Sequence, residues 1–159
     1  MDLKQQLAYA IKLAATEHYG QFDKGGQPYI LHCLKVMHYL KDYSVEVQIA
    51  GVLHDIVEDT DITLDFLSDQ GINALSLEII DRMTKKVGQT PEEYVGGILK
   101  HYQTCLVKRA DLRHNTDVRR LKGLEDKDLL RMRKYHGMFV KINHSIRLHE
   151  QIALLGGDN

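Results

Sequence analysis

The residues best placed to do chemistry lie in one apolar segment, where His54 and Asp55 stand side by side and Glu58 and Asp59 follow. A buried carboxylate beside an imidazole is costly unless the groups are paired or bound to a metal. Residues three and four positions apart share a helical face, so a helix would gather the three carboxylates and the histidine on one side. Because the carboxylates repel one another, we expect a divalent cation to neutralise them.

Three other places could complete a site around this doublet. His32 stands at the start of a predicted helix, Asp111 lies inside another, and a glycine-rich loop follows His18. Two imidazoles and two carboxylates suit Mn²⁺, Fe²⁺ or Zn²⁺ better than they suit metals that favour thiolates. Such a centre lowers the pKa of bound water and makes hydroxide available at neutral pH. A metal beside further acids therefore indicates hydrolysis, especially of phosphate esters.

The elements that must position these residues are predicted to be helices. The chain has two prolines, no tryptophan and no long alternating run of β-branched residues, which favours an all-α fold. Thr90 and Glu93 form a capping-box pattern around Pro91, which marks the start of a helix. From the spacing of apolar residues, the predicted helices span residues 3–19, 30–40, 45–60, 61–69, 72–84, 91–101, 105–121 and 126–155.

Length and charge narrow the functional classes. The 159 residues predict a single domain over residues 1–159, long enough to bury one substantial core. Lys and Arg together number 21 against 22 Asp and Glu, so bulk charge indicates neither nucleic acid nor a membrane as a partner. The chain has no start typical of a signal peptide and no apolar run long enough to cross a bilayer, so we expect a cytoplasmic protein. No pattern in the sequence predicts an oligomeric state.

The order of the motifs resembles that of a known family. The pattern consists of His18-x-Gly20-Gln21-x-x-Lys24-x-Gly26-x-Pro28-Tyr29-Ile30-x-His32, Leu53-His54-Asp55-x-Val57-Glu58-Asp59-Thr60, Met83-Thr84-Lys85 and Ala110-Asp111-x-x-x-Asn115. It is similar to the hydrolase domain of RelA/SpoT-type alarmone enzymes, which are HD-domain metal phosphohydrolases, and most of all to their small stand-alone members. The resemblance covers residues 7–121, and motifs this long and ordered are far more specific than a lone His-Asp doublet.

This resemblance implies an all-α HD-domain helical bundle that removes the 3′-pyrophosphate of (p)ppGpp and leaves GDP or GTP. It implies Mn²⁺ as the metal, with another divalent transition metal as an alternative. The residues that match the family's metal ligands are His32, His54, Asp55 and Asp111. Glu58 and Asp59 match the acidic pair that orients or deprotonates the attacking water and assists the leaving group.

The nucleotide side of the implied site departs from the family pattern. The residues that border the nucleotide by this resemblance are His18, Asp23, Lys24 and Asn115. The family often has Arg-Lys where this chain has Asp23-Lys24, and that arginine lies against the guanine base. A carboxylate could accept hydrogen bonds from guanine N1–H and N2–H₂, or the base could be a different purine. The alternatives are therefore a hydrolase of another nucleotide phosphate such as (p)ppApp, and a non-catalytic nucleotide-binding HD domain, against which Glu58 and Asp59 argue.

Further polar residues surround Asp111. The sequence leaves open whether His114 borders the site, because it neighbours both Asp111 and Asn115. The basic residues between Lys108 and Lys122 are expected to form a solvated helix surface rather than a phosphate clamp, since charged side chains on helices are mostly exposed.

Overall fold

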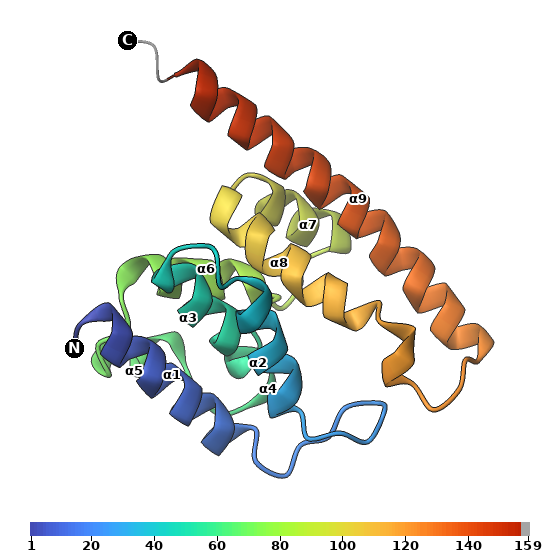
Figure 1. Ribbon diagram of the computed structural model, residues 1–159, viewed down its shortest axis with the longest axis horizontal. Coiled ribbons are helices and arrows are strands. Elements are labelled where there is room, and N and C mark those ends of the chain that lie inside the picture. Colours follow the sequence, from blue (N-terminus) through green and yellow to red (C-terminus); the bar gives the residue numbers. More distant parts are fainter. Residues whose placement is uncertain (157–159) are drawn as a thin grey trace.

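The computed structural model describes residues 1–156, and over these residues the chain is an all-α helical bundle (Figure 1). This confirms the predicted fold class. Residues 157–159, which the single-domain prediction includes, lie outside the described residues. The helices in chain order are α1 (Leu3–Glu17), α2 (Ile30–Tyr39), α3 (Val45–Leu53), α4 (Ile56–Asp59), α5 (Leu64–Asp69), α6 (Ala74–Met83), α7 (Pro91–Leu99), α8 (Tyr102–Asn115), a 3₁₀-helix η1 (Val118–Arg120) and α9 (Asp126–Leu155).

Helix α3 lies at the centre of the core and packs against α1, α2, α6 and α8. Its apolar run from Ile49 to Leu53 is fully buried, because neighbouring helices cover it on every side. Gly51 permits the close approach of α2: a methyl group at this position would lie 2.5 Å from Leu40 Cδ1 and 3.5 Å from Met37 Cα. This close packing sets the spacing between α2 and the end of α3, where the candidate ligands lie.

The predicted helix over residues 45–60 is wrong at one point, because it is interrupted at His54 and Asp55. Helix α3 ends one residue before His54, α4 begins one residue after Asp55, and Asp55 has φ −103° and ψ −3°, outside regular helix geometry. The Nδ1–H of His54 donates to the carbonyl oxygen of Gly51 at 2.8 Å. Consecutive side chains on a regular helix diverge by about 100°. The interruption lets His54 and Asp55 point to the same place instead.

The other predicted helices are present, several with shifted ends. Helix α7 begins at the predicted capping box of Thr90 and Glu93, and α9 has its predicted bounds. Helix α8 ends at Asn115 rather than at residue 121. There the Thr116 hydroxyl donates back to the Leu112 carbonyl oxygen, and the chain turns into η1. This turn brings η1 alongside the loop between α1 and α2, as the contacts below show.

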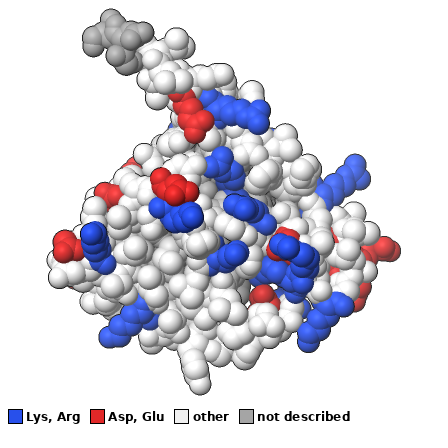
Figure 2. All heavy atoms as spheres, viewed as in Figure 1, with Lys and Arg blue, Asp and Glu red and all other residues white. Residues whose placement is uncertain are grey.

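Helix α9 spans 30 residues and lies along α7 and α8 (Figure 1). Ile142 and Ile146 are buried, whereas Ile152 and Leu155 near the end of α9 are 68% and 82% exposed. Figure 2 shows Lys and Arg side chains gathering over α8 in the same view, so the near-zero net charge conceals a locally basic surface. Within residues 1–156, no helix combines the length and the apolar character that a membrane span requires.

Candidate metal centre

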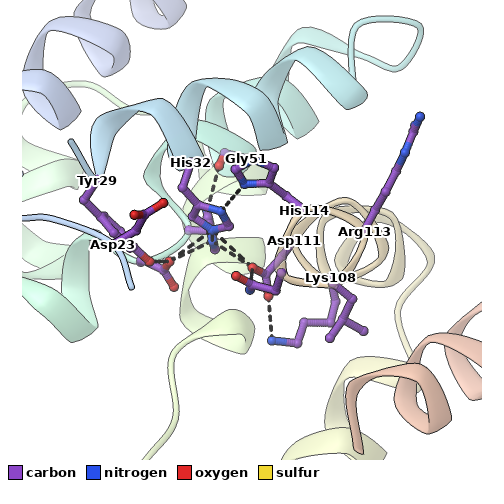
Figure 3. Close-up of polar contacts among 12 residues, drawn as sticks. Asp23, Tyr29, His32, Gly51, Lys108, Asp111, Arg113 and His114 are labelled. Carbon is purple, nitrogen blue, oxygen red and sulfur yellow. Dashed lines mark hydrogen bonds and ion pairs between the residues drawn. The ribbon is translucent and has the colours of Figure 1, made fainter. Parts of the chain in front are cut away.

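Four side chains from three parts of the fold lie close together, and Figure 3 labels two of them, His32 and Asp111. His32 comes from α2, His54 and Asp55 from the turn between α3 and α4, and Asp111 from α8. The Nε2 atoms of His32 and His54 are 3.3 Å apart, and Asp55 Oδ2 lies 3.7 Å and 2.9 Å from them. Asp111 Oδ1 lies 3.3 Å from His32 Nε2 and 3.6 Å from His54 Nε2. The structure thus brings together all four residues that the sequence predicts as metal ligands.

The two imidazoles are oriented as metal-binding histidines usually are, with a second partner on the far nitrogen. Since the Nδ1–H of His54 donates to Gly51, its Nε2 carries the lone pair in the neutral ring. The Nδ1 of His32 lies 2.7 Å from the Nδ1 of His114. Burial and the charge of Arg120 lower the pKa of His114 to about 4, so its neutral ring can accept the Nδ1–H of His32. His114, which the sequence left open, therefore holds a ligand in position, whereas Arg113 points away (Figure 3).

The electrostatics of the four groups favour a cation. Burial alone would lower the pKa of His54, but the charges of Asp55 and Asp111 and their hydrogen bonds raise it well above its ordinary value. Burial raises the pKa of Asp111, yet the charge of Lys108 and the hydrogen bonds from His32 and His54 hold it well below the usual range. A site that draws a proton onto a buried imidazole stabilises positive charge. The donor set and its surroundings therefore fit a divalent metal.

The two carboxylates have their own supporting contacts. Asp55 Oδ2 accepts a hydrogen bond from the Tyr29 hydroxyl at 2.5 Å. Asp111 Oδ2 accepts from Lys108 Nζ at 2.8 Å, and Asp111 Oδ1 accepts from Asn115 Nδ2 at 2.6 Å. The side chain of Lys108 is only 12% exposed, so the expectation of a solvated surface is wrong for this residue, whose charge is needed beside Asp111.

Sequence reasoning singled out neither Tyr29 nor Lys108 as a site residue. Each stands three positions before a predicted ligand, Tyr29 before His32 and Lys108 before Asp111. That spacing places two residues on the same helical face. The sequence therefore held a usable signal, but many residues share such a spacing with a ligand.

Glu58 and Asp59, the predicted catalytic acids, are both exposed at the end of α4. Glu58 Oε1 accepts a hydrogen bond from the backbone N–H of Lys85 at 2.5 Å, which ties α4 to the loop after α6. Burial and the negative charge of Asp55 raise the pKa of Asp59. Both carboxylates are thus open to solvent within one helical turn of a candidate ligand.

The predicted substrate-binding residues occupy different environments. His18 is buried, its Nδ1 lies 2.7 Å from Gln21 Oε1, and its ring packs against Tyr29 with centroids 5.2 Å apart. Its Nε2 has no hydrogen-bond partner among the described residues. Lys24 is exposed, whereas the Asp23 carboxylate is paired with Arg120. The structure therefore places His18 behind Tyr29 rather than at an open surface.

Two cavities flank Asn115, which contacts the ligand Asp111. One has a volume of about 220 Å³ and is bordered by both Tyr29 and Asn115. Its other lining residues are Phe22, Asp23, Lys24, Gly25, Asp117, Arg120, Leu121, Arg131, Met132 and Tyr135. The second has a volume of about 290 Å³ and includes Asp111 in its wall. Its cationic lining residues are Lys85, Lys108 and Lys134.

Comparison with known proteins shows where this chain has relatives. A family model described as an HD domain matches residues 10–91, just over half of the chain. A guanosine-3′,5′-bis(diphosphate) 3′-pyrophosphohydrolase of Borreliella burgdorferi is 27% identical over 125 residues, and a GTP pyrophosphokinase of Streptomyces coelicolor is 33% identical over 122 residues. Each alignment covers 70% of this chain but only 19% and 14% of the relative, so the chain spans less than a fifth of these proteins.

A solved structure shares the fold. It is a metazoan orthologue of SpoT that is described as hydrolysing ppGpp. The TM-score is 0.72 at 22% sequence identity, and the match covers 89% of this chain and 85% of that one. The arrangement of helices is therefore common to both proteins.

Proposed function

Because the chain belongs to the HD-domain family, we propose that it is a metal-dependent phosphohydrolase that removes the 3′-pyrophosphate of (p)ppGpp to give GDP or GTP. The observation that carries this proposal is the convergence of two imidazole nitrogens and two carboxylate oxygens at one point. Several relatives are named as guanosine-3′,5′-bis(diphosphate) 3′-pyrophosphohydrolases, which supports the choice of substrate.

The ion we propose for this centre is Mn²⁺, with another divalent transition metal as the alternative. Imidazole and carboxylate ligands together suit such ions, and the candidate centre contains no thiolate. A bound divalent cation would polarise a phosphoryl oxygen and lower the pKa of water. His32, His54, Asp55 and Asp111 would hold it, with their outer partners keeping each ligand in orientation.

The acidic pair beside the centre would handle protons. In the proposed hydrolysis, the oxygen of water forms a bond to the 3′ phosphorus while the bond from phosphorus to the ribose 3′ oxygen breaks. Glu58 and Asp59 would take the proton from the attacking water and deliver one to the departing 3′ oxygen. The raised pKa of Asp59 favours a carboxyl group that exchanges protons closer to neutral pH.

The two cavities differ in the part of a nucleotide that each suits. The cavity beside Asp111 is bordered by three lysines, and ammonium groups favour phosphate oxygens. The cavity on the other side of Asn115 is lined by Phe22, Met132 and Tyr135, and Phe22 is 66% exposed. It also has cationic lining residues, but two of them, Arg120 and Arg131, are paired with the carboxylates of Asp23 and Asp128. Aromatic and thioether side chains suit the flat face of a base. We therefore propose that the base occupies the cavity lined by Phe22 and Tyr135, and that the phosphates occupy the lysine-lined cavity beside Asp111.

A substrate panel tests the proposal. Purified protein with Mn²⁺ is incubated separately with ppGpp, ppApp and GTP, and the products are resolved by ion exchange. The expected result is pyrophosphate and GDP from ppGpp. Asp55→Ala protein prepared in parallel reveals any contaminating hydrolase. Faster release of pyrophosphate from ppApp than from ppGpp would show that the preferred substrate is the adenosine nucleotide. Binding of a nucleotide without turnover of any of the three would overturn the enzymatic proposal.

A further inference from the structure

The carboxylate of Asp23 is occupied within the protein. Its Oδ1 accepts the backbone N–H of Gln27 at 2.9 Å, and its Oδ2 accepts from Arg120 Nη2 at 2.9 Å. The side chain is only 11% exposed. Burial raises the pKa of Asp23, but the hydrogen bonds from Gln27 and Arg120 outweigh it and keep the pKa below its ordinary value. Asp23 is therefore an ionised carboxylate, and each of its two oxygens already accepts a hydrogen bond from within the protein.

Arg120 projects from η1 into the wall of the cavity proposed for the base. Its Nη1 donates to the His114 carbonyl oxygen at 3.0 Å and to Asn115 Oδ1 at 3.3 Å, and its Nη2 donates to Asp23. A guanidinium has five N–H groups. Three of them, two on Nη1 and one on Nη2, donate to acceptors in the described part of the chain, which leaves Nε–H and the second N–H of Nη2. The side chain is 19% exposed and is held from three directions.

The backbone beside this pair leaves no room for adjustment. A methyl group added at Gly25 would lie 2.0 Å from the carbonyl oxygen of Arg120. The loop that carries Asp23 therefore touches η1 directly, with no side chain between them. Because the loop and η1 are joined by this contact and by the ion pair, the position of Arg120 in the cavity depends on the position of Asp23.

From this geometry we infer that Arg120 selects the base of the nucleotide and that Asp23 is a positioning residue that holds its guanidinium in the cavity. The inference rests on the proposed function, which it deepens. Guanine offers two acceptors, O6 and N7, to a paired donor such as arginine. Adenine offers N7 and an amino group, and a guanidinium has no acceptor for that amino group. Arg120 therefore favours guanosine over adenosine substrates.

The test is the ratio of kcat/KM for ppGpp to kcat/KM for ppApp. Arg120→Gln should lower this ratio by about 5- to 150-fold, mainly through KM for ppGpp, since glutamine pairs with adenine instead. Calorimetric binding of GDP and ADP should show the same loss of preference without turnover. The matched control is Arg119→Gln, because Arg119 is 87% exposed and pairs only with Asp117 among the described residues. It should leave the ratio unchanged.

Asp23→Asn separates positioning from contact with the base. If Asp23 acts through Arg120, this variant should lower the ratio in the same direction but by less than Arg120→Gln, and the double variant should fall short of the sum of the two effects. A larger effect of Asp23→Asn would overturn the assignment. If circular dichroism shows that Arg120→Gln does not fold, Arg120→Lys takes its place. Lysine keeps the positive charge but lacks the paired N–H donors of the guanidinium, so this variant should also lower the ratio.

Different results would overturn the proposed hydrolase function and the proposed role of Arg120. Turnover of ppGpp with an unchanged ratio in folded Arg120→Gln protein would overturn the role of Arg120 alone. No turnover in the wild type, together with tighter binding of GDP than ADP that Arg120→Gln abolishes, would overturn the enzymatic function and leave the base assignment standing. Equal binding of GDP and ADP by a wild type without turnover would overturn both.

Discussion

The candidate metal centre and the side of the base cavity formed by Asp23, Gly25 and Arg120, here called the wall, are held in place in contrasting ways. At the centre, His32, His54 and Asp111 are buried. The side-chain atom of each that does not face the centre has its own hydrogen-bond partner. In the wall, a loop and a 3₁₀-helix meet through one ion pair and one close backbone contact. The proposed reaction chemistry therefore lies in the buried core, whereas the proposed base recognition lies on a loop and a 3₁₀-helix that contact the residues around the centre through Arg120.

One residue connects the two regions. Asn115 donates through Nδ2 to the candidate ligand Asp111 and accepts through Oδ1 from Arg120. Its amide orientation is fixed, because the donor faces one partner and the acceptor faces the other. Changes in the centre should therefore remove metal binding or turnover, whereas changes in the loop that carries Asp23 should alter substrate binding while metal binding persists.

The largest effect is expected from Asp55→Ala. This substitution removes a candidate ligand, so metal binding and turnover should both be lost. The loss should exceed the roughly 10–100-fold decrease that follows when only a residue hydrogen-bonded to a ligand is removed. Metal content by mass spectrometry and Mn²⁺ titration calorimetry measure the loss. Asp61→Ala, an exposed carboxylate shortly after the site, serves as the control. Retention of one metal per chain in Asp55→Ala would remove this residue from the centre.

Glu58→Gln should come next, with turnover about 10²–10⁴-fold lower and metal binding unchanged. Glutamine retains an oxygen that can accept the Lys85 N–H, so the tie between α4 and the loop after α6 is preserved. Steady-state kinetics and metal content are measured on the same preparation. Wild-type turnover in this variant would contradict the proposed proton transfer by Glu58.

Lys108→Met tests how tightly the core holds the centre. It leaves the buried Asp111 without its cationic partner, which should cost about 3–5 kcal/mol of unfolding free energy without metal. Added Mn²⁺ should reduce that cost, because the ion supplies positive charge to the same carboxylate. Urea unfolding with and without Mn²⁺ measures both. Lys127→Met, which breaks an exposed ion pair with Glu125, should cost no more than about 1 kcal/mol.

Gly25→Ala should disturb the wall alone. The added methyl group meets the Arg120 carbonyl oxygen, so the loop and η1 must separate at a cost of about 1–3 kcal/mol. KM for ppGpp should rise while metal content stays at the wild-type level. Gly123→Ala has open space for its methyl group and should change neither quantity. Loss of metal from Gly25→Ala protein would show that the two regions are not separable.

The smallest effect concerns pH. Because the pKa of Asp23 in the folded protein lies below its ordinary 3.8, its stabilising contribution is present above that value and is lost as pH falls through the lower folded pKa. The difference in unfolding free energy between wild type and Asp23→Asn should therefore be about 1 kcal/mol or less at neutral pH and shrink in acid. A difference that grew in acid would contradict the ion pair.

Apolar periodicity predicted the fold class, because it is a local signal, and the resemblance of the ordered motifs to a known family predicted the four candidate ligands. The interruption at His54 and Asp55 was missed, since it depends on a side chain that bonds to the carbonyl of Gly51. The pairing of His32 with His114 joins segments that are distant along the chain, and no local pattern records it. The roles assigned to the site residues stay predictions until the variants are measured.

The contact between the loop and η1 also limits how this chain can evolve. Asp23 and Arg120 are 97 residues apart, yet a change at either position alone leaves a charge without its partner. Among close relatives, the two positions should therefore change together, and Gly25 should rarely be replaced. Natural drift in base preference would then proceed by paired substitutions, with each intermediate disfavoured, rather than by single steps.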